Sequence, residues 1–404
     1  MNILIINAHS SKNKGDAGII LSMIDSMRKK IPDCNIKVKT RFPEIDKHAY
    51  RVNVGEAIFN INIHEKTTKL EKLILTMKMM RVLKNKSQRP IIEDEDYSWA
   101  DIVVSCGGGF LLTHGFSLMT LQHLVQIKTA MDYKKPVIIY SQSIGPFYNN
   151  FISNITKKIL NNVTKIFVRE KISYELLKEM GVTTSIEIVP DSAFSMDSQE
   201  SIYVDNLLKD IKSSNNGPLI GITVRDWNFP EVDNPSYYRD KYIKSIQEVI
   251  IYLEKINNAK VLLMPQVLGP NKFNDDRNIS KEILSGIPDT EAELIDFDFH
   301  PRELKYLYSK VDMFIGTRMH SNIFALSSII PTVAINYEHK TTGIMELLEL
   351  KDHVIDINDI TPEILIQMSN KCWNNREQLK SHLNERIPKV IEQAQLPAEF
   401  INQL

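Results

Sequence analysis

The sequence lacks most of the features that mark specialised classes of protein. It has only three cysteines (Cys34, Cys106 and Cys372), and they lie far apart in the chain. This excludes a disulfide-built secreted fold and a cysteine-based metal site, and it is typical of a reducing cytoplasm. Cys106 follows a predicted strand, so a buried structural residue is favoured there over a nucleophile.

An excess of charge of one sign and a long apolar run are also missing. The net charge is -1 at pH 7, which indicates no general affinity for nucleic acid. No segment approaches the roughly 20 apolar residues of a membrane-spanning helix. The N-terminal MNILIINAHSSK is too short in its apolar part for a signal peptide and predicts a first strand. We therefore expect a globular cytoplasmic enzyme.

Familiar metal and nucleotide motifs do not occur. The sequence has no zinc, calcium or iron motif, and the Asp275–Asp276 pair alone is a weak metal signal. The GxGxxG dinucleotide pattern and the Walker phosphate loop are both absent. We therefore expect neither a metal nor an organic cofactor.

Apolar strand-like runs alternate with amphipathic helical stretches from end to end of the chain. This alternation is typical of parallel α/β layers. A polar stretch over 197–217, which ends in SSNNGP, predicts a connection between two domains. The simplest architecture is α/β, with two Rossmann-like doubly wound domains facing a cleft at residues 1–200 and 215–360. Helices at 361–404 would pack back on the body.

The segment from Gly316 to Gly343 carries the strongest chemical signal. An apolar strand over 313–315 runs into a turn where Arg318 and His320 flank one residue at a predicted helix start. Arginine offers a planar cationic fork for carboxylate or phosphate, and the helix start offers free N–H donors. Ligands of open α/β sheets bind where strands end. The segment predicts an anion site, with a core βαβ unit carrying one solvent-facing arginine as the alternative.

Polar residues follow several other predicted strands. Arg225 ends the first strand of the second domain, where it would face the cleft near Arg318. Asp16 follows the first strand, either as an N-cap or as a carboxylate that binds or deprotonates a sugar hydroxyl. Further candidates for lining the cleft or the acceptor site have equally good structural interpretations; they are Asn13, Gly108, Gly109, Ser143, Asp191 and Glu338.

One basic segment, from Lys66 to Arg89, departs from the α/β pattern. It carries lysines and arginines among leucines and methionines. A basic amphipathic helix of this kind can lie on an anionic membrane surface. The structural alternative, which the pattern favours, is a helix that packs its Leu/Met stripe on the sheet and leaves its lysines in water.

Several segments together resemble the polysaccharide pyruvyl transferase family. In order over residues 1 to about 348 they are NKGD, CGGGF, SQSIGPF, VRE with Ser173, PDSAF, ITVR, and GTRMHSNIFAL with IPTVAINYEHKTTGI. The Arg-x-His segment with its downstream Tyr and Lys is the most specific of them. The leucine that the family places between Arg and His is Met319 here, a change of similar volume.

The resemblance implies both a fold and a reaction. The fold would be similar to that of GT-B glycosyltransferases, with the acceptor on the N-terminal domain and phosphoenolpyruvate on the C-terminal domain. The reaction would move the enolpyruvyl unit of phosphoenolpyruvate onto two hydroxyls of a sugar in a bacterial exopolysaccharide or capsule precursor. The products would be a pyruvate ketal and phosphate, with phosphoenolpyruvate as co-substrate and no cofactor.

The resemblance also implies roles for individual residues. Arg318 and His320 would contact phosphoenolpyruvate, and Arg225 is the candidate for the second arginine. Lys340 is a further candidate for the anion clamp. His320 would protonate the carbon or the leaving phosphate, and Asp16 is the candidate general base.

Other functions remain open from the sequence. One is a glycosyltransferase that uses a nucleotide sugar, with Arg318 and Lys340 on the diphosphate and Glu338 on the ribose. Another is a non-catalytic anion-binding component of polysaccharide assembly. Family members act on lipid-linked or nucleotide-linked saccharides, so the acceptor is not fixed. We expect no nucleic-acid partner and a cytoplasmic location, with the basic segment as the place of any contact with the inner membrane.

Overall fold

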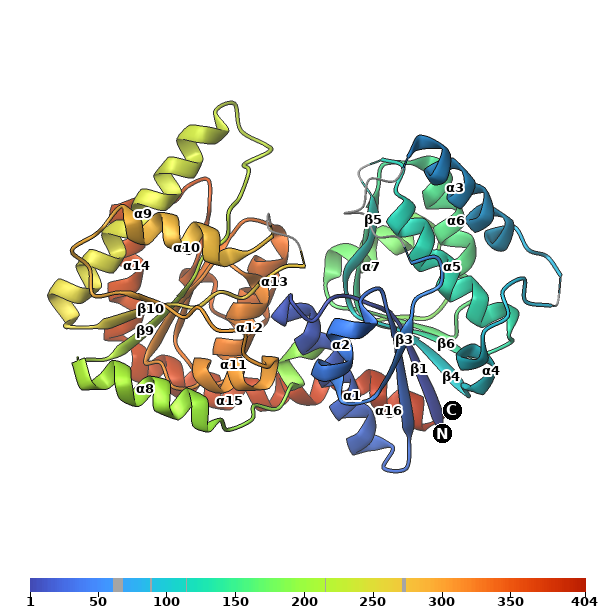
Figure 1. Cartoon of the computed structure of the whole chain (residues 1–404), viewed down its shortest axis with the longest axis horizontal. Coiled ribbons are helices and arrows are strands. Elements are labelled where there is room, and N and C mark those ends of the chain that lie inside the picture. The colour runs from blue at the N-terminus through green and yellow to red at the C-terminus, as the bar shows by residue number, and fades with distance from the viewer. Residues whose placement is uncertain (61–67, 88, 114, 215, 271–273) are drawn as a thin grey trace. The chain divides into compact units, whose positions relative to one another are not determined.

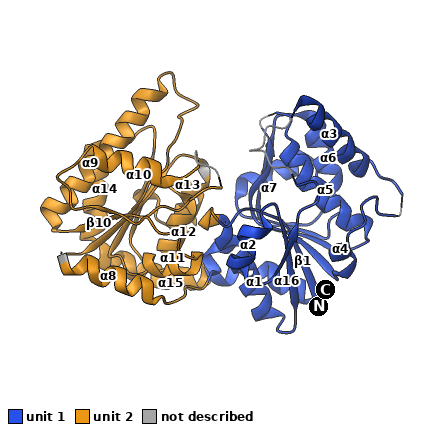
Figure 2. Cartoon of the chain, viewed as in Figure 1, with its two compact units in different colours: residues 1–11, 16–196, 391–404 blue, residues 12–15, 197–390 orange. Residues whose placement is uncertain are grey.

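The computed structural model describes residues 1–60, 68–87, 89–113, 115–214, 216–270 and 274–404. The chain forms two compact units (Figure 2). Unit 1 contains Met1–Ser11, Asp16–Met196 and Ile391–Leu404, and unit 2 contains Lys12–Gly15 and Asp197–Val390. The short loop Lys12–Gly15 thus belongs to unit 2 although it follows the first strand of unit 1. The C-terminal tail is divided between the units at Ile391.

Unit 1 is built on a sheet of parallel strands (Figure 1). Their order is β3-β2-β1-β4-β6-β7-β8, and β5 pairs with β6. The strands are β1 (Asn2–Ala8), β2 (Asn35–Thr40), β3 (Asn53–Glu56), β4 (Ile102–Ser105), β5 (Gly108–Thr113), β6 (Val137–Phe147), β7 (Lys165–Val168) and β8 (Ile186–Ile188).

Unit 2 has a second parallel sheet with the order β11-β10-β9-β12-β13-β14. Its strands are β9 (Leu219–Thr223), β10 (Lys260–Leu263), β11 (Glu293–Leu294), β12 (Met313–Gly316), β13 (Thr332–Asn336) and β14 (Val354–Asp356). Apart from the short β11 and β14, these strands are buried along their whole length. Continuous burial is expected where helices cover both faces of a parallel sheet.

Helices connect the parallel strands in both units. In unit 1 they are α2 (Pro43–Tyr50), α3 (Lys69–Leu83), α4 (Glu95–Trp99), α5 (Leu118–Asp132), α6 (Asn150–Leu160), α7 (Lys171–Glu179), the 3-10 turn η1 (Ser192–Ser195) and α16 (Leu396–Asn402). In unit 2 they are α8 (Ile202–Ser214), α9 (Pro235–Asn257), α10 (Asp276–Ser285), α11 (Pro301–Tyr308), α12 (Met319–Ser327), α13 (His339–Leu347), η2 (Lys351–His353) and α14 (Pro362–Asn374). Two helices contain residues of both units, namely α1 (Lys14–Lys30) and α15 (Arg376–Ala394).

Each unit has its own apolar core. In unit 1 the core joins residues of β1, β4 and β6 to those of α5 and α6. In unit 2 it joins β9, β12 and β13 to α9 and α14. The predicted α/β class with two doubly wound domains is confirmed. None of the described helices is both long enough and apolar enough to span a bilayer.

Both sheets change their winding direction between two neighbouring strands. In unit 1 the change lies between β1 and β4, and in unit 2 it lies between β9 and β12. Loops that leave two such strands in opposite directions open a crevice at the carboxyl edge, where ligands of open α/β sheets bind. The loops after β9 and β12 are therefore the first place to look for a site in unit 2.

Candidate functional site

Two arginines follow the two switch-point strands of unit 2. Arg225 comes two residues after β9, and Arg318 is the residue from which α12 begins. The turn into α12 is tight, because a side chain on Gly316 would lie 1.8 Å from Oδ1 of Asn322. The Asn322 amide instead donates to the Gly316 carbonyl at 3.1 Å. Thus only Thr317 separates the end of β12 from Arg318.

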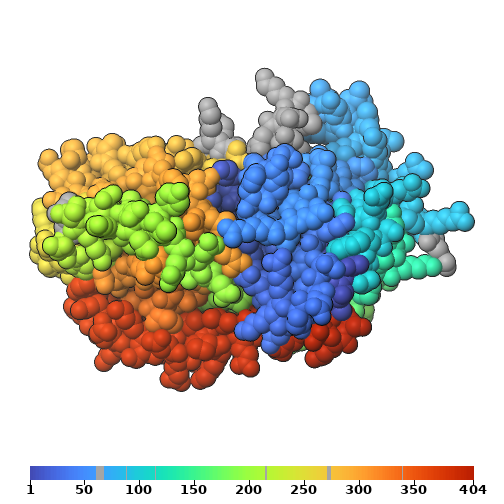
Figure 3. Space-filling model, turned by 60° about the horizontal axis from the view of Figure 1, so that its bottom comes forward, coloured from blue at the N-terminus to red at the C-terminus, as the bar shows by residue number. Residues whose placement is uncertain are grey.

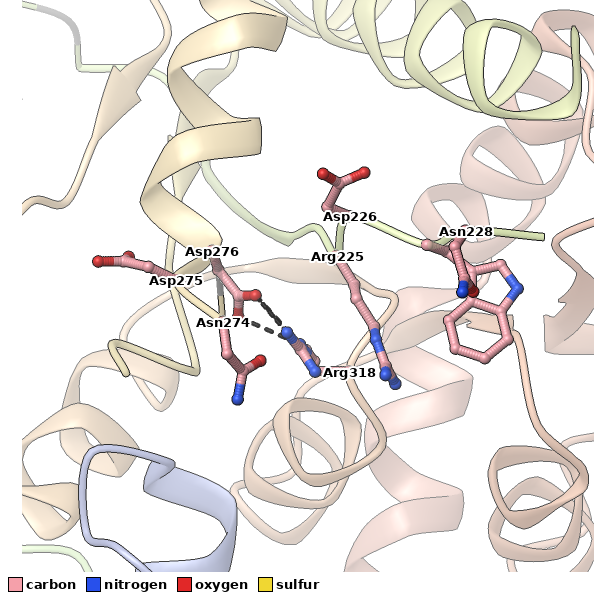
Figure 4. A pocket seen from close by; sticks show the side chains of 8 residues that line it. Arg225, Asp226, Asn228, Asn274, Asp275, Asp276 and Arg318 are labelled. Atoms are coloured by element: carbon pink, nitrogen blue, oxygen red, sulfur yellow. Dashed lines mark hydrogen bonds and ion pairs between the residues drawn. The ribbon is translucent and has the colours of Figure 1, made fainter. Parts of the chain in front are cut away.

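The two arginine side chains approach one cavity of about 350 Å³ (Figure 4). This volume lies at the lower end of the range for small-molecule sites. The lining residues come from the loop after β9 and the start of α10, together with Arg318; they are Arg225, Asp226, Trp227, Asn228, Asn274, Asp275, Asp276 and Arg318. The predicted convergence of Arg225 and Arg318 therefore occurs within unit 2.

Arg318 is held by Asp276, at the start of α10. Its Nη2 donates to Oδ1 of Asp276 at 2.5 Å, and its Nε lies 3.2 Å from both carboxylate oxygens. The same carboxylate accepts from the backbone N–H groups of Gln266 and Val267. Burial lowers the pKa of Arg318, but the charge and hydrogen bonds of Asp276 outweigh it and raise the pKa. Arg318 is thus a fixed, permanently charged group.

Arg225 is held by aromatic rings instead of a carboxylate. Its guanidinium carbon lies 4.1 Å from the centre of the Tyr337 ring and 4.7 Å from that of Trp227. These cation–π contacts orient the guanidinium without neutralising it. In the described part of the chain no carboxylate forms an ion pair with Arg225. Its charge therefore remains to attract an anion.

A hydrogen-bonded scaffold fixes the ends of the two strands. The backbone N–H of Arg225 donates to the hydroxyl of Tyr242 at 3.3 Å, and that hydroxyl lies 2.9 Å from Oγ1 of Thr317. Thr223 and Ser321 are joined in the same way at 2.7 Å. Burial raises the pKa of Tyr242 to about 12, so its hydroxyl stays protonated. The arginines thus rest on a rigid frame.

His320 lies in the first turn of α12, half-buried against Gly15. A Cβ built on Gly15 would lie 2.4 Å from Nδ1 of His320, so no larger residue fits without moving the imidazole. The Lys12–Gly15 loop is attached to unit 2 by a bridge between Asn13 and Val267. The backbone N–H of Lys14 also donates to the carbonyl of Gln266. The glycine thereby allows the close approach that sets the position of His320.

The remaining predicted residues of unit 2 have local partners. The side chain of Asn13, predicted to face the acceptor, accepts from the N–H of Gly15 at 3.1 Å, as a helix cap does. Lys340 lies 3.6 Å from Glu338 at the start of α13, and neither lines the cavity around Arg318. Their roles in binding stay predictions.

Asp16 is not a helix cap, because α1 begins two residues earlier at Lys14. It lies in the first turn of α1, and its negative charge is one of the influences that favour a higher pKa in Arg41 and in Arg169. Burial acts against this effect in both arginines, and in Arg41 it prevails, so the pKa of Arg41 is lowered. The N-cap interpretation is therefore wrong, and the role of Asp16 as a base stays a prediction.

The other candidates of unit 1 belong to buried structural contacts. Arg169 donates to Ser143 at 2.7 Å and forms an ion pair with Asp191 at 2.5 Å. Asp191 also accepts from the N–H of Ala193 at the start of η1. Burial raises the pKa of the Cys106 thiol well above its usual value, which agrees with a structural cysteine.

The glycine-rich turn lets an aromatic ring fold back on the chain. Gly108 has φ +124°, and a Cβ there would lie 2.3 Å from the ring of Phe110. Gly109 follows in β5 and is half-buried. A glycine at position 108 thus lets the Phe110 ring take its position, where it stacks on the ring of His9.

The contacts of Asp276 with Arg318, and of Trp227 and Tyr337 with Arg225, do not follow from the sequence patterns. The Asp275–Asp276 pair marks the start of α10, with Asp275 as the N-cap, and not a metal signal among the described residues. Trp227 lies two residues after Arg225, and this spacing was the one available signal for it. The pairing of Arg318 with Asp276 spans 42 residues, and no local pattern reveals it.

Comparison with known proteins gives one matching family. The sequence model of the family described as polysaccharide pyruvyl transferase matches residues 13–339. Among curated proteins, the chain is 24% identical over 412 residues to the amylovoran biosynthesis protein AmsJ of Erwinia amylovora. The match covers 98% of this chain and 97% of AmsJ.

Solved structures of similar fold are much more distant in sequence. The UDP-GlcNAc 2-epimerase of Neisseria meningitidis superposes with a TM-score of 0.62 at 13% identity, over 100% of this chain and 99% of that one. A glycosyltransferase from Rickettsia africae superposes with a TM-score of 0.58 at 10% identity, over 100% and 97%. At such identities the likeness concerns the fold, and it confirms the expected similarity to two-domain GT-B proteins.

Proposed function

This chain belongs to the polysaccharide pyruvyl transferase family, and from that premise we propose that it is a ketal-forming pyruvyltransferase. It moves the enolpyruvyl unit of phosphoenolpyruvate onto two hydroxyls of a sugar in a surface-polysaccharide precursor. The similarity to a protein of amylovoran biosynthesis supports a polysaccharide pathway. The observation that carries the proposal is the convergence of Arg225 and Arg318 on one cavity at the switch point of unit 2.

Phosphoenolpyruvate has two anionic groups, a carboxylate and a phosphate. Two guanidinium groups on one cavity match this arrangement, since each can hold one group through paired N–H donors. Arg318 is fixed in place by Asp276, and Arg225 is fixed by aromatic rings that leave its charge uncompensated. The pair is therefore suited to a small ligand with two negative groups.

The reaction needs a proton donor and a base besides the clamp. In the proposed sequence, His320 gives a proton to the methylene carbon, which becomes a methyl group, and positive charge develops at C2. A sugar hydroxyl attacks C2 and gives its proton to a base, for which Asp16 is the candidate. The C2–O bond to phosphate breaks, and phosphate leaves with the electron pair. A second hydroxyl then adds to C2, loses its proton and closes the ketal.

The acceptor in this proposal is a lipid-linked or nucleotide-linked saccharide, and the location is cytoplasmic. Three free cysteines support a reducing compartment. Lys340 and Glu338 are retained as further candidates for substrate contact, because they lie at the start of α13, which follows β13, the strand next to β12.

The test is donor dependence with identification of the product. The protein is incubated with phosphoenolpyruvate or with nucleotide sugars and a panel of lipid-linked and nucleotide-linked saccharides, and mass spectrometry seeks an added pyruvyl group. Phosphate release with that mass gain is the expected result. Arg318→Gln should lose the reaction, whereas Arg386→Gln, an ion-paired arginine on α15, should keep it. Transfer of a glycosyl group would indicate the glycosyltransferase instead, and ligand binding without turnover would indicate the non-catalytic anion-binding component. Either result would contradict the proposal.

A further inference from the structure

The switch point of unit 1 gathers a second set of polar side chains. The rings of His9, after β1, and Phe110, in β5, stack with their centres 3.2 Å apart. His123 on α5 lies edge-on to His9, with 5.3 Å between ring centres. Arg41 follows β2, and its Nη2 lies 2.9 Å from Nδ1 of His9. Residues from four elements, namely the loops after β1 and β2, strand β5 and helix α5, thus meet in one cluster.

Three nitrogens of this cluster have no partner among the described residues. Because a guanidinium can only donate, Nδ1 of His9 accepts from Arg41, so Nε2 of His9 carries the proton. That Nε2 is buried without a partner, as are Nε of Arg41 and Nδ1 of His123. The two histidines are only 8% and 2% exposed. Buried polar atoms left in this way are unfavourable, and each of them calls for an explanation such as a bound group that completes the bonding.

The cluster differs from the site of unit 2 in its charge, because its two histidines are neutral and its one arginine lies near carboxylates. Burial and the neighbouring Arg41 lower the pKa of both histidines, that of His123 to about 3, so both are neutral. The positive charge of Arg41 is opposed by Asp16 and Asp46. These carboxylates weaken the attraction of Arg41 for an anion. The donors that remain are suited to an uncharged ligand rich in hydroxyl groups.

We propose that the cluster of His9, Arg41, Phe110 and His123 binds an uncharged sugar ring of the acceptor. His9 and Arg41 donate to sugar hydroxyls, His123 accepts from one, and the half-buried Phe110 contacts the apolar face of the ring. The inference rests on the proposed function, because it identifies the class of group that the second substrate presents.

The test is saturation-transfer NMR on the full chain with methyl glycosides of glucose, galactose and mannose. At least one glycoside should receive saturation from the wild-type protein. Arg41→Gln and Phe110→Ala should each lower that signal about tenfold, the loss expected from roughly 1.4 kcal/mol of binding. Phe110→Ala leaves all charges in place, so it remains informative if Arg41→Gln does not fold. Arg28→Gln, which removes an exposed arginine of α1, is the matched control.

Phosphoenolpyruvate binding to the same variants, measured by calorimetry, separates the two proposals. Sugar binding that is lost in Arg41→Gln while phosphoenolpyruvate still binds supports the inference. It is overturned if no glycoside binds, if the variants bind as the wild type does, or if inorganic phosphate displaces the sugar. Absence of phosphoenolpyruvate binding to the wild-type chain would instead contradict the proposed function and leave the sugar result standing.

Helix α3 of unit 1 carries an independent inference. It presents Leu70, Leu73, Ile74 and Met77 at i, i+3, i+4 and i+7, and these side chains are 66%, 57%, 45% and 65% exposed. Such a stripe is normally buried. The opposite face packs on the core of unit 1 through Leu75, Met79, Met80, Val82 and Leu83. The structural alternative for the basic segment thus accounts for that face of the helix but not for the exposed stripe. Lys66 lies outside the described residues.

Basic side chains flank the exposed stripe. Lys69, Lys72, Lys78 and Arg81 are exposed on α3, and Lys84 and Lys86 follow it. The one acidic residue of the helix, Glu71, is engaged in the capping box with Thr68. The space-filling view shows the light-blue segment that includes α3 at the surface of unit 1 (Figure 3). Apolar side chains ringed by cations match an anionic lipid surface.

We infer that α3 binds an anionic membrane surface, with the stripe entering the lipid and the lysines at the headgroups. The test is flotation with vesicles of phosphatidylcholine alone or mixed in equal parts with phosphatidylglycerol. The protein should float with the anionic vesicles, and salt should release it. Leu70→Ser with Met77→Ser should lower the partition at least about tenfold, since two large apolar side chains no longer enter the lipid.

The matched control is Ile202→Ser with Tyr203→Ser, which removes an equally exposed apolar pair on α8. That variant should float as the wild type does. The inference is overturned if the wild-type chain floats equally well with neutral and with anionic vesicles, or if it floats with neither. It is also overturned if the α3 variant floats as well as the wild type.

Discussion

At the switch point of unit 2, two arginines approach a cavity, and one of them, Arg225, forms no ion pair with a carboxylate of the described residues. At the switch point of unit 1, one arginine is opposed by two aspartates and meets two neutral histidines. The strands that carry these loops are alike, buried and parallel in both units. Apolar runs build the frame in both units, so the different ligands proposed for the two crevices rest on the few residues that follow each strand.

The largest effect is expected when the charge of Arg318 in unit 2 is removed. Arg318→Gln should lower kcat/KM by about 10²–10³, the equivalent of roughly 3–4 kcal/mol of lost charge pairing. Arg318→Lys should lose at least about tenfold, because an ammonium lacks the planar fork. Steady-state phosphate release with phosphoenolpyruvate and acceptor measures both.

The control for that variant concerns stability. Arg318→Gln also leaves the buried Asp276 without its ion pair, which should destabilise the fold by about 3–5 kcal/mol. Arg318→Gln combined with Asp276→Asn should recover most of this stability and none of the activity. If the double variant regains transfer, Arg318 acts only by stabilising the fold. The proposed anion binding at the switch point of unit 2 would then be wrong.

A smaller loss is expected from Gly15→Ala. The new methyl group would lie within 2.4 Å of the His320 ring, so the imidazole must move. A displacement of about 1 Å at a reacting group lowers turnover by up to about 10²-fold. The effect should appear in kcat more than in KM. Gly343→Ala is the matched control, because a Cβ there meets no atom within 4 Å. Equal activity of the two variants would remove His320 from the reaction.

The neutral state of the buried His123 in unit 1 predicts that the stability of the fold depends on pH. His123 has a folded pKa of about 3, below the usual 6.5, so the unfolded chain binds its proton first as the pH falls. Stability should therefore decrease from about pH 6.5 downward, by roughly 2 kcal/mol at pH 5 for this histidine. Thermal unfolding of the wild type and His123→Asn at pH 7 and 5 tests it. A variant with the same pH dependence as the wild type would contradict the neutral state of the ring.

The frame of both units could be predicted from the sequence, whereas the contacts of the site residues could not. Buried parallel strands appear as apolar runs, so the ends of β9 and β12 located Arg225 and Arg318 correctly. Asp276 and Tyr337 hold these arginines from other loops, and such pairing depends on the packing of distant segments. The loop Lys12–Gly15 shows the same limit, because its place in unit 2 depends on a bridge to Val267.

The smallest expected effect concerns how Arg225 is held. Trp227→Leu removes one of the two rings beside its guanidinium, and cation–π contacts contribute roughly 0.5–2 kcal/mol. KM for phosphoenolpyruvate should rise about 2- to 30-fold with little change in kcat, because the arginine keeps its charge and loses only its orientation. Trp373→Leu is the matched control, since its ring lies beside Arg376 of α15 at a similar distance of 4.3 Å. A fall in kcat with unchanged KM would mean that Arg225 acts on the transition state, and unit 2 would then use both of its arginines for catalysis.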